Sequence, residues 1–481
     1  QHPHTLASLN NLANLLRVMG LTSEAARLQR SAVEARQGAL GASHPDTLES
    51  LNNLVALMHT TGDHEAALHL QRRVLDSAQV TVGPTHPLTL QASSNMASLL
   101  RVRGQHAEAE AFQHQALMGR METLGPTHPH TLASLNNLAS LLRLMGRHDE
   151  AEPLQQQALA GREAVLGPTH PHTLASLNSL ASLLWLMGRY EEAEPLQRRA
   201  LEGREATLGP THPQTLASLH NAASLLRAMG KRQEAEKLQR RALQGMEATL
   251  GPAHPHTLTC IGGLALILEE LGDHKEAERL QRQALEVRKA QLGPTHPDTL
   301  ASMNNLAVLM QSVGSQEEAE QLQRCALKGL EATLGPTHPN TLMCLGALAL
   351  LLEKLGKYDE AETLQRRVLC VREATLGFRH PDTLASLNNL AVLLQAMGKC
   401  GEAELLQRRA LEGREATLGP SHPDTLQSRH NLAAQYRIVA SSLQVPELED
   451  TEWHQRSHHR SFLECGAFCG RAGLGVSSCS Q

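Results

Sequence analysis

Leucine and alanine recur along the chain at helical spacing, in two stretches per 42 residues. In the copy that spans residues 128–169, the first stretch places five apolar side chains within about 120° on a helical wheel, namely Leu132, Leu135, Leu138, Ala139 and Leu142. The second stretch forms another stripe, made of Ala151, Leu154, Ala158 and Leu159. Each copy therefore predicts two amphipathic helices with the polar side chains on the opposite faces.

The residues between the stripes predict where these helices begin and end. Pro129 cannot continue a helix, and Thr131 is expected to cap the first helix by accepting a hydrogen bond from a backbone amide. The acidic residues at 149–150 favour the start of the second helix, because they lie at the positive end of its dipole. Gly167 and Pro168 predict its end.

The pattern repeats with the dipeptide His-Pro, which returns every 42 residues from His2 to His422. Such a period is typical of a solenoid, in which each unit buries its apolar face by stacking on its neighbours. We expect ten units over residues 2–421, a partial eleventh unit that acts as a cap over 422–440, and an unrelated or disordered tail over 441–481. The fold class is all-α.

Small residues indicate where the helices come close. Ala139 and Ala151 recur as a pair in other copies, which predicts that the two helices of a unit pack as an antiparallel hairpin. A glycine inside the second helix, such as Gly161, costs roughly 1 kcal/mol relative to alanine. Its recurrence suggests a close approach of helices from neighbouring units.

Composition excludes several classes of protein. The net charge is −5 with acidic and basic residues interspersed, so nucleic acid is not an expected partner. No apolar run is long enough for membrane insertion. Five cysteines lie in helical repeat positions without regular partner spacing, which is typical of a reducing compartment and favours the cytoplasm.

No constellation for catalysis, a metal or a cofactor stands out. Of the 27 histidines, eleven belong to the His-Pro motif, one per unit, and are too far apart to converge on one ion. His458, His459, Cys465 and Cys469 offer zinc-binding chemistry, but their spacing matches no strong zinc pattern. We therefore expect no enzymatic activity, no catalytic residue, no metal site and no cofactor.

The order of Leu-Ala in the first helix, Gly at the turn, and Glu-Ala and Ala-Leu in the second is the tetratricopeptide (TPR) pattern. More narrowly, strings such as LNNLA, EAE, RRALE and LGPTHP resemble the repeats of kinesin light chain, and nephrocystin-like and NB-ARC-fused TPR proteins share them. The resemblance implies a right-handed TPR superhelix whose concave groove binds extended peptide segments of other proteins. It also implies a cytoplasmic, cytoskeleton-associated adaptor with kinesin heavy chain or cargo adaptors as partners.

Two other functions stay open. The array could be the recognition arm of a larger ciliary, nephrocystin-like or NB-ARC sensor protein, or a purely architectural scaffold. The sequence begins with Gln1, so we expect further residues before it. A heptad repeat there would favour the motor adaptor, and a phosphate-binding loop would favour the sensor.

In TPR folds the side of the first helix opposite the leucines belongs to the concave surface, and in this chain it carries asparagines. An asparagine amide both donates and accepts, so a row of amides can satisfy the backbone of an extended peptide. The expected peptide-binding asparagines are Asn10, Asn11, Asn52, Asn53, Asn95, Asn136, Asn137, Asn178 and Asn221. An alternative is that some of these amides bond to adjacent helices.

Another position of this face changes charge midway along the chain. It carries Arg17, Arg101, Arg143 and Arg227, with His59 and Trp185 between them, and continues as Glu269, Gln311, Glu353 and Gln395. Guanidinium groups pair with carboxylates, so the amino-terminal part of the groove is expected to favour acidic peptides. Kinesin light chain repeats recognise tryptophan-acidic segments, so the resemblance points the same way. A solvated charged face is the alternative.

Two units lack the asparagines and carry Gly262–Gly263 and Gly346–Ala347 instead. These units match each other 84 residues apart, which suggests duplication of a two-unit block. We therefore expect the continuous peptide track between residues 2 and about 250. The tail places Trp453 beside acidic residues and is a candidate internal ligand for that track.

Overall fold

The structure is a computed structural model, and it describes residues 8–9, 12–13, 15–16, 22–61 and 63–442. Within these residues it contains helices and no strand. The first helices of the units are α3 (Pro45–Thr61), α5 (Pro87–Val102), α7 (Pro129–Leu144), α9 (Pro171–Leu186), α11 (Pro213–Ala228), α13 (Pro255–Leu271), α15 (Pro297–Val313), α17 (Pro339–Lys354), α19 (Pro381–Ala396) and α21 (Pro423–Ser442). The second helices are α2 (Thr22–Leu40), α4 (His64–Thr81), α6 (His106–Leu124), α8 (His148–Leu166), α10 (Tyr190–Leu208), α12 (Arg232–Leu250), α14 (His274–Leu292), α16 (Gln316–Leu334), α18 (Tyr358–Leu376) and α20 (Cys400–Leu418).

The helices pack in chain order as antiparallel pairs, so the prediction of an all-α solenoid is confirmed. The predicted stripe of α7 is buried, with Leu138 completely inaccessible to solvent. Ala139 and Ala151 are also buried, as expected where the two helices of a hairpin approach closely. Stability in this array comes from leucine and alanine packing within and between neighbouring units.

The first helices begin with a different cap from the one expected. His128, not Thr131, is the N-cap of α7, and its Nδ1 accepts a hydrogen bond from the backbone amide of His130 at 3.2 Å. The buried Thr131 hydroxyl instead donates to the carbonyl oxygen of Gly125 at 2.8 Å, at the end of the preceding helix. The His-Pro motif is therefore a capping motif, and the prediction for threonine was wrong because proline fixes the helix start three residues earlier.

The second helices end as predicted. α8 stops before Gly167, which adopts a φ of 89° that only glycine takes readily. The glycine inside this helix also has a close neighbour, because a Cβ built on Gly161 would lie 2.4 Å from Leu132 Cδ2. Leu132 belongs to the same hairpin, so the close approach lies within a unit and not between units as expected.

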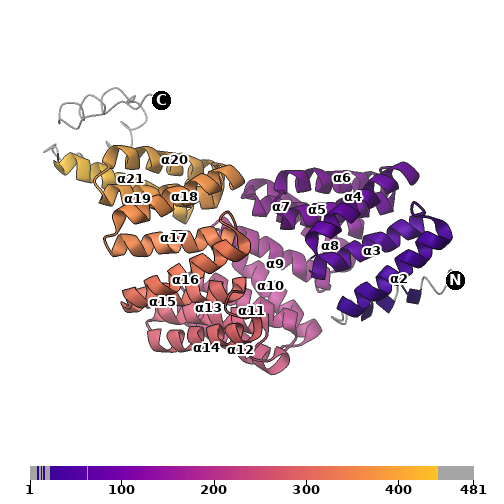
Figure 1. Cartoon of the computed structure of the whole chain (residues 1–481), viewed down its shortest axis with the longest axis horizontal. Coiled ribbons are helices and arrows are strands. Elements are labelled where there is room, and N and C mark those ends of the chain that lie inside the picture. Colours follow the sequence, from indigo (N-terminus) through magenta and orange to yellow (C-terminus); the bar gives the residue numbers. More distant parts are fainter. Residues whose placement is uncertain (1–7, 10–11, 14, 17–21, 62, 443–481) are drawn as a thin grey trace.

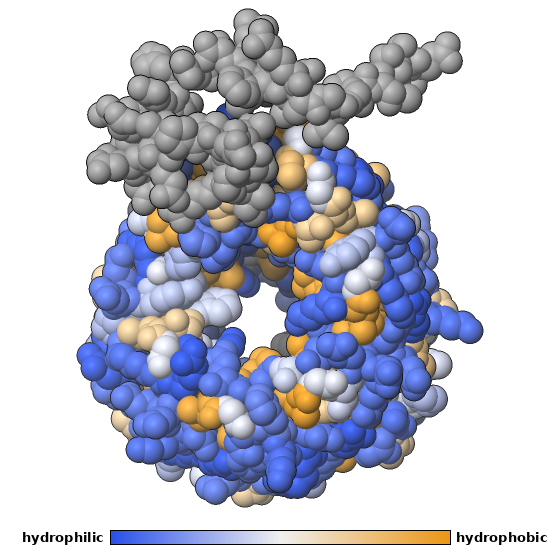
Figure 2. Space-filling view, turned by 90° about the vertical axis from the view of Figure 1, so that its left-hand side faces the viewer, coloured by the Kyte–Doolittle hydropathy of each residue, from blue (hydrophilic) through white to orange (hydrophobic). Residues whose placement is uncertain are grey.

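The stacked hairpins wind into a superhelix (Figure 1). Seen from one end, an opening runs through the middle of the molecule, and apolar side chains gather around it (Figure 2). No helix in the described part of the chain has the length and apolar character needed to cross a membrane.

Candidate functional site: the concave face and the seam

The asparagines of the first helices form a ladder between units. Asn52 Oδ1 accepts hydrogen bonds from Gln71 Nε2 at 3.0 Å and from Asn95 Nδ2 of the next unit at 2.8 Å. The same three-residue arrangement recurs at Asn178 with Gln197 and Asn221, and at Asn388 with Gln407 and Asn431. Much of the hydrogen-bonding capacity of these amides is thus satisfied inside the protein.

Two asparagines that lack an asparagine partner in the preceding unit are exposed. Asn137 and Asn305 are exposed, and the positions where a partner asparagine would lie carry Ser94 and Gly262. Asn136 is half-buried and accepts a hydrogen bond from Gln155 Nε2 at 2.9 Å. Of the predicted asparagines in the described part of the chain, Asn137 is therefore the exposed one.

The other predicted asparagines have less to offer. Asn53 is half-buried, and Asn95 uses its Oδ1 to accept from Gln91 Nε2 at 3.0 Å. Asn10, Asn11 and Arg17 lie outside the described residues, as do the cysteines and histidines of the tail and Trp453.

Two arginines of the concave face lie near each other and have no ion-pair partner among the described residues. Arg101 is exposed and Arg143 is half-buried, and neither forms an ion pair with any described residue. Burial and the positive charge of Arg101 lower the pKa of Arg143. Arg227 differs, because its Nη1 lies 2.6 Å from Glu270 Oε1. Trp185, which is 37% exposed, occupies the position between Arg143 and Arg227.

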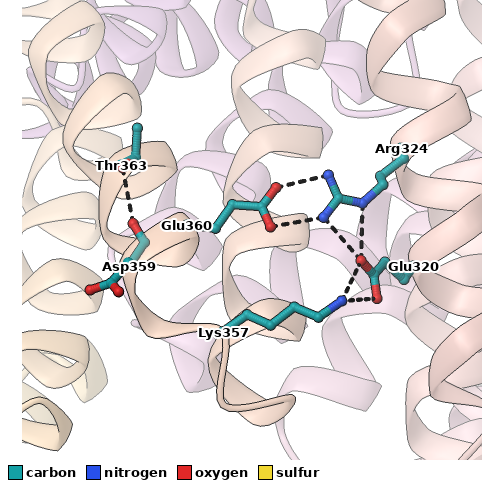
Figure 3. Close-up of polar contacts among 6 residues, drawn as sticks. All are labelled: Glu320, Arg324, Lys357, Asp359, Glu360 and Thr363. Atoms are coloured by element: carbon teal, nitrogen blue, oxygen red, sulfur yellow. Dashed lines mark hydrogen bonds and ion pairs between the residues drawn. The ribbon is translucent and has the colours of Figure 1, made fainter.

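The outer surface shows the opposite behaviour. There the charges of successive second helices are paired, as when Arg324 contacts Glu320 of its own helix and Glu360 of the next one (Figure 3). Lys357 completes this cluster with a contact of 2.8 Å to Glu320. Equivalent ion pairs recur between successive second helices along the array. Arg101 and Arg143 on the concave face differ from these residues because they are unpaired within the described part of the chain.

A buried arginine-serine pair between units was missed by the sequence interpretation. Arg162 Nη1 donates to Ser176 Oγ at 2.6 Å and to the carbonyl oxygen of His172 at 3.1 Å. The pair recurs as Arg36–Ser50, Arg120–Ser134, Arg204–Ser218, Arg288–Ser302, Arg372–Ser386 and Arg414–Ser428. In the units that lack the arginine, the serine is replaced as well, and the two positions carry Ala78–Ala92, Met246–Cys260 or Leu330–Cys344. This joint replacement was a signal present in the sequence.

The superhelix closes on itself along a seam between its turns, where α20 meets α8. His380 Nε2 lies 3.3 Å from the carbonyl oxygen of Leu144, and His422 Nε2 lies 3.4 Å from that of Leu186. Both Nδ1 atoms accept from backbone amides, so each Nε2 carries the proton and donates. Gly146 permits this contact, because a Cβ built on it would lie 2.5 Å from Pro381 Cδ.

At the seam lies a cavity of about 800 Å³ that is open to solvent. It is lined by the starts of α6 and α8 and by the turn after α18. The turn carries Phe378 and Arg379 where the other units mostly have proline and threonine, and Arg379 stacks on the Phe378 ring at 5.6 Å. His106, His148 and His380 also line this cavity. No cluster of side chains suited to a metal ion occurs among the described residues.

Burial lowers the pKa of His106, His148 and His422 at the seam, so the folded protein favours their neutral forms. Nearby positive charges add to the effect, from Arg101 and His380 on His106 and from His380 and Arg143 on His148. The unfolded chain binds these protons at the ordinary value of about 6.5. Stability contributed by the neutral histidines is therefore present above that pH and is lost as the pH falls below it.

We expect the melting temperature to fall between about pH 7.5 and about pH 5.5, and to fall less in His422→Asn. Asparagine keeps the capping function but removes the buried titratable ring. His254→Asn is the matched control, because His254 caps α13 in the same way and forms no hydrogen bond across the seam among the described residues. Equal pH dependence of His422→Asn and the unchanged protein would contradict this assignment.

Comparison with known proteins agrees with this geometry. Models of the tetratricopeptide repeat match residues 4–79, 88–164, 131–206, 173–248, 215–290, 262–332, 341–382 and 383–424. No curated protein gives a match.

Solved structures give further matches. A putative kinesin light chain TPR-like protein from Podosopora anserina is 30% identical over 43% of this chain and 98% of that chain, with a TM-score of 0.40. A Rap protein complexed with competence and sporulation factor is 13% identical, covers 77% of this chain and 98% of that chain, and has a TM-score of 0.53. NprR, a quorum sensor of B. thuringiensis, is 17% identical over 76% of this chain and 99% of that chain, also with a TM-score of 0.53.

Proposed function

The chain belongs to the tetratricopeptide repeat family, and on that premise we propose that it is a non-enzymatic adaptor of the kinesin light chain kind, whose concave groove binds extended peptide segments of partner proteins. The amino-terminal half of the groove selects acidic segments. Its partners are cargo or scaffold proteins of the cytoplasm, and attachment to a kinesin heavy chain is the most specific form of this proposal.

The observation that supports acidic ligands is the pair of unpaired guanidinium groups at Arg101 and Arg143. Two like charges held close together raise the energy of the free protein, and an incoming carboxylate removes this repulsion. Arginine also presents a planar fork that matches a carboxylate in two hydrogen bonds. The exposed amide of Asn137 and the partly exposed ring of Trp185 lie on the same series of helices and offer polar and aromatic contacts.

Most of the asparagine ladder has a structural role in this proposal. Asn52 and Asn178 each accept two hydrogen bonds within the protein, so their replacement by alanine would disturb the packing of units as well as any ligand. Experiments on peptide binding should therefore change the arginines rather than the ladder.

A fluorescein-labelled peptide with the sequence Glu-Asp-Thr-Glu-Trp tests the proposal by fluorescence anisotropy with the full chain. We expect a dissociation constant on the order of micromolar that weakens with added salt. The double variant Arg101→Gln/Arg143→Gln should weaken binding by about tenfold or more, since a charge-assisted hydrogen bond contributes roughly 1.5–3 kcal/mol. The melting temperature should not fall, because neither arginine has an ion-pair partner.

Two control variants separate this site from general electrostatics. Arg227→Gln should change affinity less, because that guanidinium is already paired with Glu270. Arg72→Gln, on the outer surface, should leave affinity unchanged. If all variants weaken binding equally, or if a charge-reversed peptide with lysine in place of the acidic residues binds as well, the acidic-peptide groove is disproved.

A further inference from the structure

The carboxyl-terminal half of the groove carries an apolar ladder that the amino-terminal half lacks. Leu266, Val308, Leu350 and Val392 occupy one position of the repeat and are 44%, 38%, 39% and 38% exposed. The same position carries serine in four earlier units, at Ser98, Ser140, Ser182 and Ser224. Large apolar side chains thus recur at solvent-exposed positions of α13, α15, α17 and α19.

These side chains lie on the concave face. Each follows the second asparagine position by three residues and precedes the charged position by three, and residues three apart lie on the same side of a helix. On α17 the row runs from Met343, which is 47% exposed, through Gly346 and Leu350 to Glu353. Apolar side chains also gather around the central opening of the molecule (Figure 2).

Two glycines, Gly262 and Gly346, leave open space beside this ladder. A Cβ built on Gly262 or on Gly346 would meet no atom within 4 Å, so the space above both residues is open. The amino-terminal units fill the same position with amides such as Asn52 and Asn178. In the carboxyl-terminal half, α15 and α19 carry Asn304 and Asn388 at this position, so the additional open space lies on the alternate helices α13 and α17.

The charge beside the ladder is negative. Glu269 and Glu353 take the position held by Arg101 and Arg143 in the first half, and neither glutamate forms an ion pair with a described residue. Both are partly buried. Burial raises the pKa of Glu353, and the neighbouring Lys354 offsets part of this rise. The glutamates of the outer surface, such as Glu320, are instead paired with cations at ion-pair distance.

We propose that the concave face of α13, α15, α17 and α19 is a second docking surface, which binds a peptide segment that combines apolar side chains with lysine or arginine. The apolar side chains contact the ladder of Leu266, Val308, Leu350 and Val392, and the cations pair with Glu269 and Glu353. A polyproline II peptide has three residues per turn, so an apolar residue at every third position places the apolar side chains on one side of the peptide, where they can face the ladder.

This proposal concerns the half of the groove that the acidic-peptide function leaves unused, so it goes beyond that function and does not depend on it. One molecule can then hold two segments of opposite charge, or two partners at once. If one partner carries both segments, binding of the first raises the effective concentration of the second, so the overall affinity exceeds that of either segment alone.

A labelled peptide made of four Leu-Lys-Pro triplets tests this surface with the full chain by fluorescence anisotropy. We expect it to bind, and peptides of Ser-Lys-Pro or Leu-Glu-Pro triplets to bind at least about tenfold more weakly, since they lack the apolar or the cationic contact. The variant Leu266→Ser/Val308→Ser/Leu350→Ser/Val392→Ser should lose the Leu-Lys-Pro peptide. Serine is the residue that the chain itself uses at this position, so the fold should persist, with unchanged circular dichroism and melting.

A second variant isolates the charges. Glu269→Gln/Glu353→Gln copies Gln311 and Gln395 and should weaken the Leu-Lys-Pro peptide and reduce its salt dependence. Arg101→Gln/Arg143→Gln should not affect this peptide, and the serine variant should not affect the acidic one, so the two groove functions fail separately. Equal binding of all three triplet peptides, retention of binding by both variants, or self-association that the serine variant abolishes without any peptide binding would each overturn the proposal.

Discussion

Replacing Leu345 by alanine should lower the free energy of unfolding by about 2–5 kcal/mol, the usual range for a buried leucine truncated to alanine. Leu345 of α17 is fully buried and packs with Leu342 and Val368. Leu327 of the preceding unit also packs against this cluster. The cavity would therefore weaken both the hairpin and the contact between two units.

The consequence extends along the array, because units of a solenoid stabilise one another mainly through nearest neighbours. We expect urea unfolding of Leu345→Ala to separate into two steps, with the residues after α17 unfolding first. Leu350→Ala on the same helix is the control, since Leu350 is 39% exposed and should cost no more than about 0.5 kcal/mol. Equal destabilisation by the two changes would show that α17 does not pack as described.

Breaking one arginine-serine pair should have the second-largest effect. Ser176→Ala removes the hydroxyl that accepts from Arg162 Nη1, and Arg162 is only 7% exposed. Burial already lowers the pKa of this arginine, which indicates that the charge is poorly solvated. Because a buried donor left without its acceptor keeps its desolvation cost, the free energy of unfolding should fall by about 1–3 kcal/mol in urea titrations.

Other units of the chain carry apolar residues in place of the arginine-serine pair. At Met246–Cys260 and Leu330–Cys344 both members of the pair are apolar and buried. The double variant Arg162→Met/Ser176→Cys should therefore recover most of the stability lost in Ser176→Ala, since replacing both partners of a buried polar pair is often nearly neutral. A double variant that is less stable than Ser176→Ala would show that the buried charge itself stabilises the contact between units.

Periodicity in the sequence predicted the hairpins well because the helix wheel and the glycine stops are local properties. Leu138, Ala139 and Gly167 behave as their spacing indicates. The cap was mistaken because His128 and Thr131 are both able to accept a hydrogen bond, and only the position of the helix start decides between them. The close contact at Gly161 could also be located only from the structure. The sequence does not show whether the nearest helix belongs to the same unit or to a neighbouring one.

The binding residues were harder to predict, because exposure on a helix face does not reveal what the next unit supplies. Asn95 and Asn137 occupy the same position of the repeat, but Asn95 donates to Asn52 of the preceding unit, whereas Asn137 has Ser94 at the corresponding place and is exposed. Arg143 and Arg227 differ in the same way, because Glu270 neutralises only Arg227. The peptide-binding residues stay a prediction, and we propose Arg101, Asn137 and Arg143 as the first of them to test.

The seam bears on how such an array lengthens or shortens during evolution. His380 and His422 each reach a carbonyl 236 residues earlier, and both sides of these contacts are built from motifs that recur every 42 residues. A unit gained or lost by duplication or deletion would therefore bring an equivalent histidine to an equivalent turn. Recombination between copies can therefore change the length of the groove and the order of its basic, amide and apolar positions. The contacts at the seam would not need further substitutions.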